Sequence, residues 1–581
     1  MDEAPDGGRD AAVDDDLTGR LRELWRALLG VPKVDADSNF FELGGHSMLA
    51  TRLMARARKR LGVDLPANLI FEFPVFADFA AQVARATRHG TAAQPVDAPQ
   101  ATGREHGPLS LQQQQLMLVE VGLGPSPANK VVVVLEVEAG DGGRVDAELL
   151  RRALHRLVGR HPMLRTGFRP EGAGHVQVVL PAVADDGVLE ETDLRELPPA
   201  DALRRARRRV RQAHLRPFDL AAGGLLHAQL FRRSGAADLL ALHLHHLACD
   251  GRSQQVLVDD LAAGYDALAD TTATATANAA ATEAGTGTEA GTGTAGAVPT
   301  ATHPTDVISY LDYALWQEGR WPATLRQSRP HWRAVVRELA DDPARMPREP
   351  ATTVAVARSA TEVAPEVMAA VRRWAAGQNA TSVVVLAAAV AAAVARLAGL
   401  SSVGVGTLLE NRPLAEVERT VGPFANSTLL AVPVAAEATP RQLVHLVGER
   451  LTAARQWSDL PLETLIAGPA ADAAVDPAEL IDVVLSVEVA GDRPAGGRLR
   501  LRPVTDDGPP LLPVAVAAQR TVHAHLGDAD RLRLAVEHAD DPDEAARAGA
   551  LLDHVVGLLT AVVSAPDTPL PAPSAVGAPP R

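Results

Sequence analysis

The sequence predicts a multidomain protein in which a small four-helix bundle is followed by a larger α+β region. Three observations predict this fold class. Residues 15–88 carry Leu, Phe and Trp at helical spacing. Residues 108–565 alternate strand-like and helix-like segments, which is typical of layered domains. A stretch of Ala, Thr, Gly and Glu at residues 271–305 divides this region into two halves with a similar order of elements.

The N-terminal bundle is predicted from its apolar spacing and its helix stops. One helix begins at Asp16 and ends before Gly30, and another occupies residues 47–61 before Gly62. The first helix carries Leu17, Leu21, Leu24, Trp25 and Leu28, and the second carries Leu49, Leu53, Ala57 and Leu61. A third apolar segment covers residues 69–79. Three or four short helices therefore form the bundle.

The two halves of the larger region are assigned to residues 108–300 and 306–565. Strands are expected near residues 131–137, 225–231, 239–245, 354, 403–408 and 483–489. Helices are expected after Asp146, after Gly251, and over residues 365–376 and 382–397. Four segments are expected to lack structure: the tail 1–14, the linker 89–107, the loop 271–305 and the tail 566–581.

Composition excludes several classes of function. The net charge of −15 and the pI near 5.7 argue against nucleic-acid binding, so the arginines at 204–211 and at 56–60 are interpreted as solvated helix faces. The polar N-terminus lacks a secretion signal, and the apolar run 383–395 is too short to cross a membrane. The single cysteine, Cys249, precludes an intrachain disulfide, so a cytoplasmic protein is expected.

The richest motif for chemistry is HHLACDG at residues 245–251. An apolar strand precedes it and an amphipathic helix follows it, so the imidazole of His246 would project from a rigid strand end. Imidazole titrates near neutrality and can transfer a proton there. Cys249 falls beside this motif and is interpreted as a packing residue rather than a nucleophile. No second ligand cluster accompanies the histidines, so no metal is expected.

A second motif, DSNFFELGGHSMLA, covers residues 37–50. Its two glycines leave the backbone free to expose the hydroxyl of Ser47. The serine stands at the start of a helix, where free N–H groups and the helix dipole favour a phosphodiester. A serine-hydrolase elbow is excluded, because it requires glycine two residues after the serine and Leu49 stands there.

The two motifs resemble two families of non-ribosomal peptide synthetase domains. The segment around Ser47 resembles a peptidyl carrier protein, and HHLACDG resembles the HHxxxDG signature of condensation domains. Three further elements of the latter family are matched in order: RHPMLRTGF at 160–168, YLDYALWQ at 310–317, and NRPLAEVERTVGPFANS at 411–427. The opening SLQQQQLM at 110–117 departs from the family pattern, because it lacks the arginine and the tryptophan.

The resemblance implies a V-shaped pair of lobes, each like chloramphenicol acetyltransferase, with the active site in a tunnel between them. It implies that Ser47 carries 4′-phosphopantetheine and that His246 orients and deprotonates an attacking amine. His245 would be structural, and the amide of Gly251 would contact the developing oxyanion. Asp250 would hold the loop through an ion pair with Arg165.

The function expected from this resemblance is amide formation between a thioester donor on Ser47 and an acceptor amine. The expected partners are a phosphopantetheinyl transferase, an adenylation domain or other loading enzyme in trans, and upstream or downstream carrier proteins. Neither nucleic acid nor a membrane is expected as a partner. Three alternatives stay open: an alcohol or free amine as acceptor, epimerisation, and a non-catalytic recruitment platform.

Overall fold

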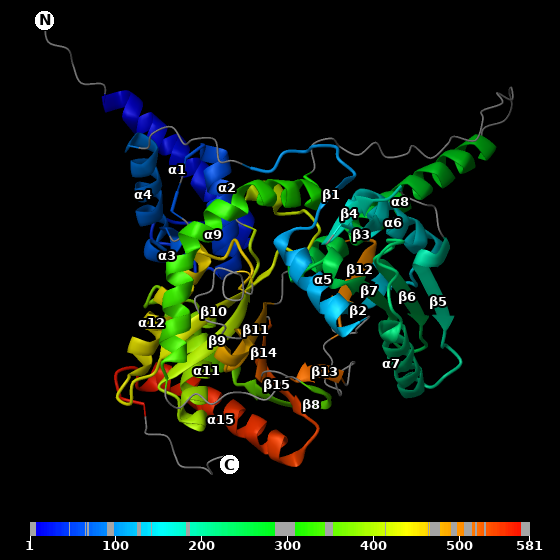
Figure 1. Cartoon of the computed structure of the whole chain (residues 1–581). Coiled ribbons are helices and arrows are strands. Elements are labelled where there is room, and N and C mark those ends of the chain that lie inside the picture. Colours follow the sequence, from blue (N-terminus) through cyan, green and yellow to red (C-terminus); the bar gives the residue numbers. More distant parts are fainter. Residues whose placement is uncertain are drawn as a thin grey trace, which may run out of the picture.

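The computed structural model shows an N-terminal bundle and two lobes (Figure 1). It describes residues 7–45, 47–63, 65–66, 69–89, 98–124, 129–140, 142–172, 174–181, 186–284, 308–342, 352–412, 414–462, 464, 477–489, 497–504, 514–517, 520–527 and 530–570. The predicted fold class is confirmed: a helical unit precedes a two-lobed α+β region.

The N-terminal bundle packs four helices around Trp25. The helices are α1 (Gly7–Leu29), α2 (Ser47–Leu61), α3 (Leu69–Glu72) and α4 (Phe76–His89). The Trp25 ring is fully buried and meets the edges of Phe40 and Phe76 at centroid distances of 5.1 and 5.3 Å. α1 begins at Gly7, so the expected tail at residues 1–14 is helical from that residue onward.

The N-lobe is built on a five-stranded sheet in the order β12-β2-β7-β6-β5. Its strands are β2 (Lys130–Ala139), β5 (Leu189–Asp193), β6 (Leu226–Arg232), β7 (Asp238–His245) and β12 (Leu499–Pro503). Helices α6 (Ala147–Arg160) and α8 (Gly251–Ala284) cover one face, and α7 (Pro199–Leu215) covers the other. β7 is therefore buried on both faces: Leu240 and Leu242 pack beside α6 and α8, and Leu239 and Ala241 pack beside α7.

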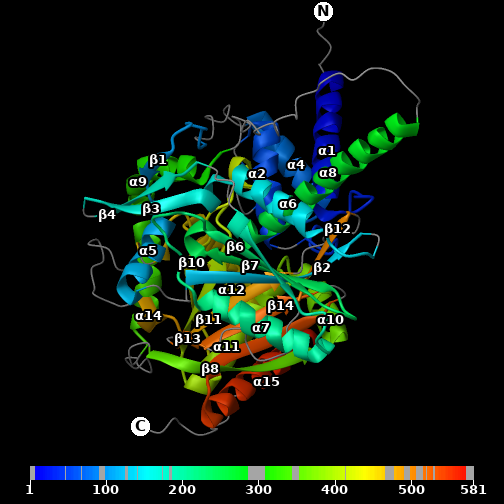
Figure 2. The ribbon, with the colours of Figure 1, turned by 90° about the vertical axis from the view of Figure 1, so that its right-hand side faces the viewer.

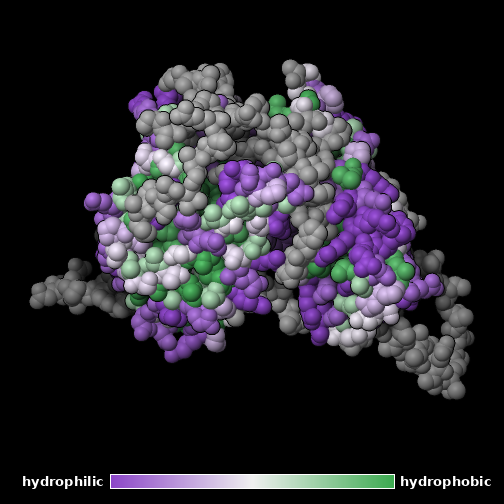
Figure 3. All heavy atoms as spheres, turned by 90° about the horizontal axis from the view of Figure 1, so that it is seen from below, coloured by the Kyte–Doolittle hydropathy of each residue, from purple (hydrophilic) through white to green (hydrophobic). Residues whose placement is uncertain are grey.

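α7 explains the arginine group at residues 204–211. Ala202, Ala206, Val210 and His214 of this helix are buried against the sheet, while most of its arginines face outward. Seen from below, the side of the N-lobe that carries α7 is strongly hydrophilic (Figure 3).

The C-lobe is built on a seven-stranded sheet in the order β10-β9-β11-β14-β15-β8-β13. Its strands are β8 (Thr352–Val363), β9 (Ser402–Leu409), β10 (Asn426–Pro433), β11 (Val483–Val489), β13 (Val514–Ala517), β14 (Arg520–Leu526) and β15 (Leu532–Ala539). Its main helices are α10 (Pro365–Ala376), α11 (Ser382–Ala398), α12 (Pro440–Gln456) and α15 (Pro542–Ser564). α15 has the length and apolarity of a membrane span, but its buried residues pack in the core of this lobe.

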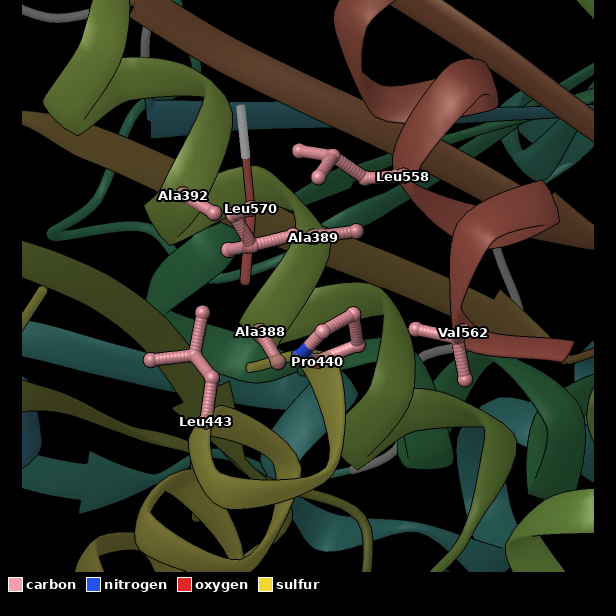
Figure 4. Close-up of a pocket in the computed structure, with 8 residues that line it drawn as sticks. All are labelled: Ala388, Ala389, Ala392, Pro440, Leu443, Leu558, Val562 and Leu570. Carbon is pink, nitrogen blue, oxygen red and sulfur yellow. The ribbon is translucent and has the colours of Figure 1, made fainter. Parts of the chain in front are cut away.

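Helices α11, α12 and α15 leave a small gap between them (Figure 4). Its lining is entirely apolar and includes Ala388, Ala392, Leu443 and Leu558. The gap lies within the helical layer of the C-lobe, which is remote in the fold from the end of β7. We interpret it as imperfect packing around small alanine side chains.

Several segments join the two lobes. β12 follows β11 of the C-lobe in sequence, but it pairs with β2 of the N-lobe. A small sheet of β1 (His106–Pro108), β4 (Gly174–Val179) and β3 (Thr166–Glu171) adjoins α5 (Leu111–Leu123). The long helix α9 (Tyr310–Ala340) contacts both regions: the Tyr310 hydroxyl is 2.8 Å from Ser110 Oγ and donates to the Pro423 carbonyl at 2.8 Å.

The other three segments expected to lack structure are also ordered in part. α8 continues to Ala284, inside the expected loop, because Ala-rich sequence extends a helix that packing has already nucleated (Figure 2). Near the end of the expected linker, the backbone N–H of Thr102 donates to Asp312 at 2.8 Å. In the expected C-terminal tail, Leu570 is buried and its N–H donates to Ala438. Residues 285–307 and 571–581 lie outside the described part of the chain.

Candidate active site

His245 and His246 stand where β7 ends and a short 3₁₀ turn, η4 (His246–Ala248), begins. The His245 ring is buried, and its Nδ1 accepts a hydrogen bond from the backbone N–H of Leu247 at 3.1 Å. The Nε2 atom lies 3.6 Å from Glu120 Oε2. Burial lowers the pKa of His245 to about 4, so the ring is neutral and holds the turn in place.

His246 differs from its neighbour because its side chain is partly exposed. Burial of much of the ring lowers the pKa of His246 below its ordinary value, although a hydrogen bond with the backbone of Cys249 and the charge of Asp250 oppose this shift. The neutral imidazole therefore predominates at neutral pH. A neutral ring that donates through one nitrogen can accept a proton at the other, so this side chain can serve as a base for a bound group.

Asp250 is buried and accepts five hydrogen bonds from described residues. One oxygen accepts from the N–H and hydroxyl of Ser253 and from Arg412 Nη2, at 2.7, 2.7 and 2.9 Å. The other oxygen accepts from the backbone N–H groups of Phe424 and Ala425 at 3.0 and 3.2 Å. Three of these donors belong to the C-lobe. Asp250 therefore links the turn η4, which we call the histidine turn, to residues 410–425, which we call the bridging loop.

The cationic partner of Asp250 is Arg412, which corrects the expected ion pair with Arg165. Arg165 ends a 3₁₀ turn, and its Nη1 donates to the carbonyl of Leu180. The N–H of Leu180 donates back to the carbonyl of Arg165 at 3.0 Å, which holds Arg165 against β4. Since the Asp250 oxygens already have their donors from elsewhere, Arg165 supports the small sheet instead.

Arg412 is itself held on several sides. Its Nη1 donates to the carbonyls of Val417 and Thr420 at 2.9 and 2.5 Å, and its guanidinium lies 4.1 Å from the centre of the Phe424 ring. Asn411 before it adopts a positive φ of 45°, which asparagine tolerates better than most residues. The Asn-Arg-Pro element in the sequence marked this segment, but not the role of its arginine.

Gly251 begins the helix that follows the histidine turn. It is the first residue of α8, its φ is not positive, and a Cβ added to it would meet open space. Neither a positive φ nor a close contact therefore requires glycine at this position. What glycine provides is the lack of a side chain beside the histidine turn, and a backbone N–H at a helix N-terminus.

Cys249 is fully buried, and burial raises the pKa of its thiol far above the ordinary value. A thiol in this state is inert, which agrees with its interpretation as a packing residue. Among the described residues, no group of three or more His, Cys, Asp or Glu side chains is arranged to hold a metal ion.

The bridging loop also contacts the N-terminal bundle. Three basic residues of α2 form ion pairs with it: Arg52 with Glu410 at 3.0 Å, Arg56 with Glu418 at 2.5 Å and Lys59 with Glu416 at 3.2 Å. Nearby, the guanidinium of Arg455 lies 4.9 Å from the centre of the Phe71 ring of α3. The helix that begins at Ser47 therefore lies on the loop that holds Asp250. The arginines at 56–60 were expected to form a solvated helix face. That expectation is wrong for Arg56, because it pairs with Glu418, which lies 362 residues away and could not be inferred from the sequence of α2.

Comparison with known families matches both parts of the chain. The phosphopantetheine attachment site family matches residues 19–83, and the condensation domain family matches residues 104–279 and 298–496. A linear gramicidin synthase protein of Brevibacillus parabrevis is 28% identical over 83% of this chain. The dimodular nonribosomal peptide synthase of Bacillus subtilis is 30% identical over 81% of this chain. The chain spans 6% and 18% of the lengths of these two relatives.

Solved structures share the fold. SgcC5 from Streptomyces globisporus aligns with a TM-score of 0.59 at 20% identity, over 80% of this chain and 100% of that one. The first condensation domain of the calcium-dependent antibiotic synthetase aligns with a TM-score of 0.59 at 20% identity, over 80% of this chain and 97% of that one. Because the condensation family alone matches more than half of the residues, the chain belongs to the condensation domain family, and a phosphopantetheine attachment domain precedes that domain.

Proposed function

We propose that the chain forms an amide bond between an acyl donor tethered to its own N-terminal bundle and an acceptor amine on a separate carrier. The observation that carries this proposal is the set of three ion pairs between α2 and the bridging loop. They hold the attachment helix beside the segment whose Arg412 binds Asp250. A tethered donor held there has a high local concentration at the site.

The residues around Ser47 fit a phosphopantetheine arm. Ser47 is the first residue of the 15-residue helix α2, where unpaired N–H groups favour an anion. Gly44 has a positive φ of 94°, and a Cβ on Gly45 would lie 2.3 Å from the ring of Phe40. Both glycines are therefore required for this entry into the helix. When attached, the arm supplies a thiol that carries the acyl group as a thioester.

In the proposed reaction, the amine nitrogen attacks the thioester carbonyl. A C–N bond forms and the C–S bond breaks, and the amine proton leaves the nitrogen as the thiol is released. His246 orients the amine and accepts that proton, which is returned to the departing sulfur. His245 and Asp250 hold the turn that carries His246, and the N–H of Gly251 is proposed to contact the developing oxyanion.

The proposed partners follow from this chemistry. A phosphopantetheinyl transferase installs the arm, an adenylation domain or another loading enzyme supplies the acyl group, and a further carrier presents the amine. We propose a cytoplasmic location, where the buried thiol of Cys249 stays reduced.

The Ser47→Ala variant is expected to gain no arm. Incubation of the wild-type chain with a phosphopantetheinyl transferase and coenzyme A should add a single phosphopantetheine, because Ser47 is the serine that begins α2. Intact-protein mass spectrometry measures the addition, and Ser38→Ala serves as the matched control. Modification of the Ser47→Ala protein would contradict the assignment.

Charge reversal tests whether the chain's own N-terminal bundle is the donor. Changing Glu410, Glu416 and Glu418 to lysine is expected to slow transfer from the tethered donor about 10-fold, because three attractive pairs become repulsive. Reversing Arg52, Arg56 and Lys59 to glutamate in the same protein should restore most of the rate. Single-turnover kinetics at low salt measures both.

The control for this experiment is a free thioester donor of the same acyl group, whose rate should not change. If the tethered donor also reacts at the wild-type rate after charge reversal, docking of α2 on the bridging loop is not the productive arrangement.

A further inference from the structure

Arg252 is a cation at the junction of the N-terminal bundle and the candidate active site. It is the second residue of α8 and lies two residues after Asp250. Its side chain is partly buried, and its Nη1 donates to Gln255 Oε1 at 2.9 Å. Its Nε atom is buried and has no hydrogen-bond partner among the described residues. An arginine in this state has spare donors for a ligand.

The acidic side chains around Arg252 are already bound by other arginines. Asp250 is paired with Arg412, Glu410 with Arg52, and Glu418 with Arg56. Arg252 is therefore the surplus cation of this cluster. Burial lowers its pKa and the charges of Arg52 and Arg412 lower it further, although the charges of Glu410 and Glu418 oppose this shift. An anion bound here would offset both the burial of the Arg252 charge and its repulsion by the neighbouring arginines.

Arg252 lies close enough to α2 for the charge of Arg52 to act on it. The charge of Arg52 lowers the pKa of Arg252. Arg52 lies five residues after Ser47, which is about 7.5 Å along the axis of α2 at 1.5 Å per residue. On its other side, Arg252 is connected through Asp250 to the turn that carries His246. Arg252 is thus linked to α2 by the charge of Arg52 and to the turn of His246 by its place in the chain.

We propose that Arg252 binds the phosphate of the phosphopantetheine arm on Ser47. This inference rests on the proposed function, which brings the arm to the candidate active site. The planar guanidinium forms paired hydrogen bonds with phosphate oxygens, and the N-terminus of the long helix α8 adds to the attraction. Holding the phosphate fixes one end of the arm, so that the thioester end lies at a set distance from His246.

The test measures binding of two soluble probes to the full-length Ser47→Ala protein by isothermal titration calorimetry. The probes are 4′-phosphopantetheine and pantetheine, which differ only in the phosphate. We expect the phosphorylated probe to bind about 10- to 100-fold more tightly, as charge-assisted hydrogen bonds allow. Adding Arg252→Gln should abolish this preference, and Arg252→Lys should keep part of it. Arg160→Gln, an equal loss of charge elsewhere on the N-lobe, should leave it unchanged.

Phosphorus NMR of the full-length protein with its arm attached gives an independent measurement. The phosphodiester resonance of the wild-type protein should differ from that of the Arg252→Gln protein, whose shift should approach that of free phosphopantetheine esters. Retention of the full phosphate preference, and of the wild-type shift, by the Arg252→Gln protein would overturn the inference.

The two proposals fail in different ways. If the loaded chain forms no amide but the phosphate preference depends on Arg252, the proposed reaction is wrong and the phosphate site stands. If amide forms and the Arg252→Gln protein binds both probes as the unsubstituted one does, only the phosphate site is lost. The variant His246→Ala should leave the binding preference unchanged, because it removes no positive charge at neutral pH.

Discussion

Replacement of His246 by alanine is expected to lower the rate of amide formation by about 10²- to 10⁴-fold, the usual contribution of a positioned general base. His246 is the partly exposed imidazole of the turn, and its ring is neutral at neutral pH. The measurement is single-turnover transfer from a donor loaded on Ser47 to a carrier-bound amine. His175→Ala, which removes a partly exposed imidazole from β4, is the matched control.

The pH dependence of the wild-type rate should identify the same group. The pKa of His246 is lowered by burial, so its neutral form predominates above an unperturbed histidine pKa of about 6.5. The limb that reports His246 should therefore lie below about pH 6.5, and this limb should disappear in His246→Ala. A second limb at about pH 7.7 would report deprotonation of the acceptor, since that is the ordinary pKa of an α-amine.

An unchanged rate in His246→Ala would favour the recruitment platform over the enzyme. The acceptor is tested separately by comparing a carrier-bound amine with a free amine and with an alcohol. A product formed only from the carrier-bound amine would support the proposed function, and faster reaction of the free acceptors would favour the alternatives.

Breaking the Asp250–Arg412 pair is expected to destabilise the contact between the lobes by about 3–5 kcal/mol, because removal of one partner leaves a buried charge uncompensated. Asp250→Ala removes the acceptor of the Phe424 and Ala425 amides as well. Hydrogen exchange at these two amides measures the local free energy of opening. Their exchange should accelerate by more than about 100-fold in both Asp250→Ala and Arg412→Ala, as a loss of about 3 kcal/mol requires.

Arg165→Ala is the control that separates the two candidate partners. Because Arg165 bonds Leu180 rather than Asp250, this variant should leave exchange at Phe424 and Ala425 near the wild-type rate. Rapid exchange in Arg165→Ala, together with slow exchange in Arg412→Ala, would restore the pairing expected from the family resemblance.

A double variant refines the measurement. If Asp250 and Arg412 act mainly on each other, the double variant leaves no charge unpaired. Its loss in the free energy of opening should then be smaller than the sum of the losses in Asp250→Ala and Arg412→Ala. Losses in free energy that add up would show that Arg412 acts chiefly through its hydrogen bonds to Val417 and Thr420.

Local features were predictable because neighbouring residues encode them. The apolar spacing of α2 and its stop at Gly62 are visible in a few turns of sequence, and so is the run of leucines that makes β7 a buried strand. The paired motifs around Ser47 and His246 also predicted the families that the comparisons found. The boundaries of α1 and α8 were less predictable, because Ala- and Asp-rich segments resemble tails in composition and extend as helices once a packed turn precedes or follows them.

The sequence by itself determined the order of domains, the family and the two residues that carry the chemistry of the proposed reaction. Only the tertiary structure decided which arginine binds Asp250, since Arg165 and Arg412 both stand in recognisable motifs and 162 residues separate Asp250 from the one it meets. It also decided that α2 lies on the bridging loop, where the acidic side chains near Arg252 are bound by other arginines. Charge pairing of this kind depends on how the two lobes and the bundle pack in space. The sequence pattern does not give the distances between charged side chains that are far apart in the chain.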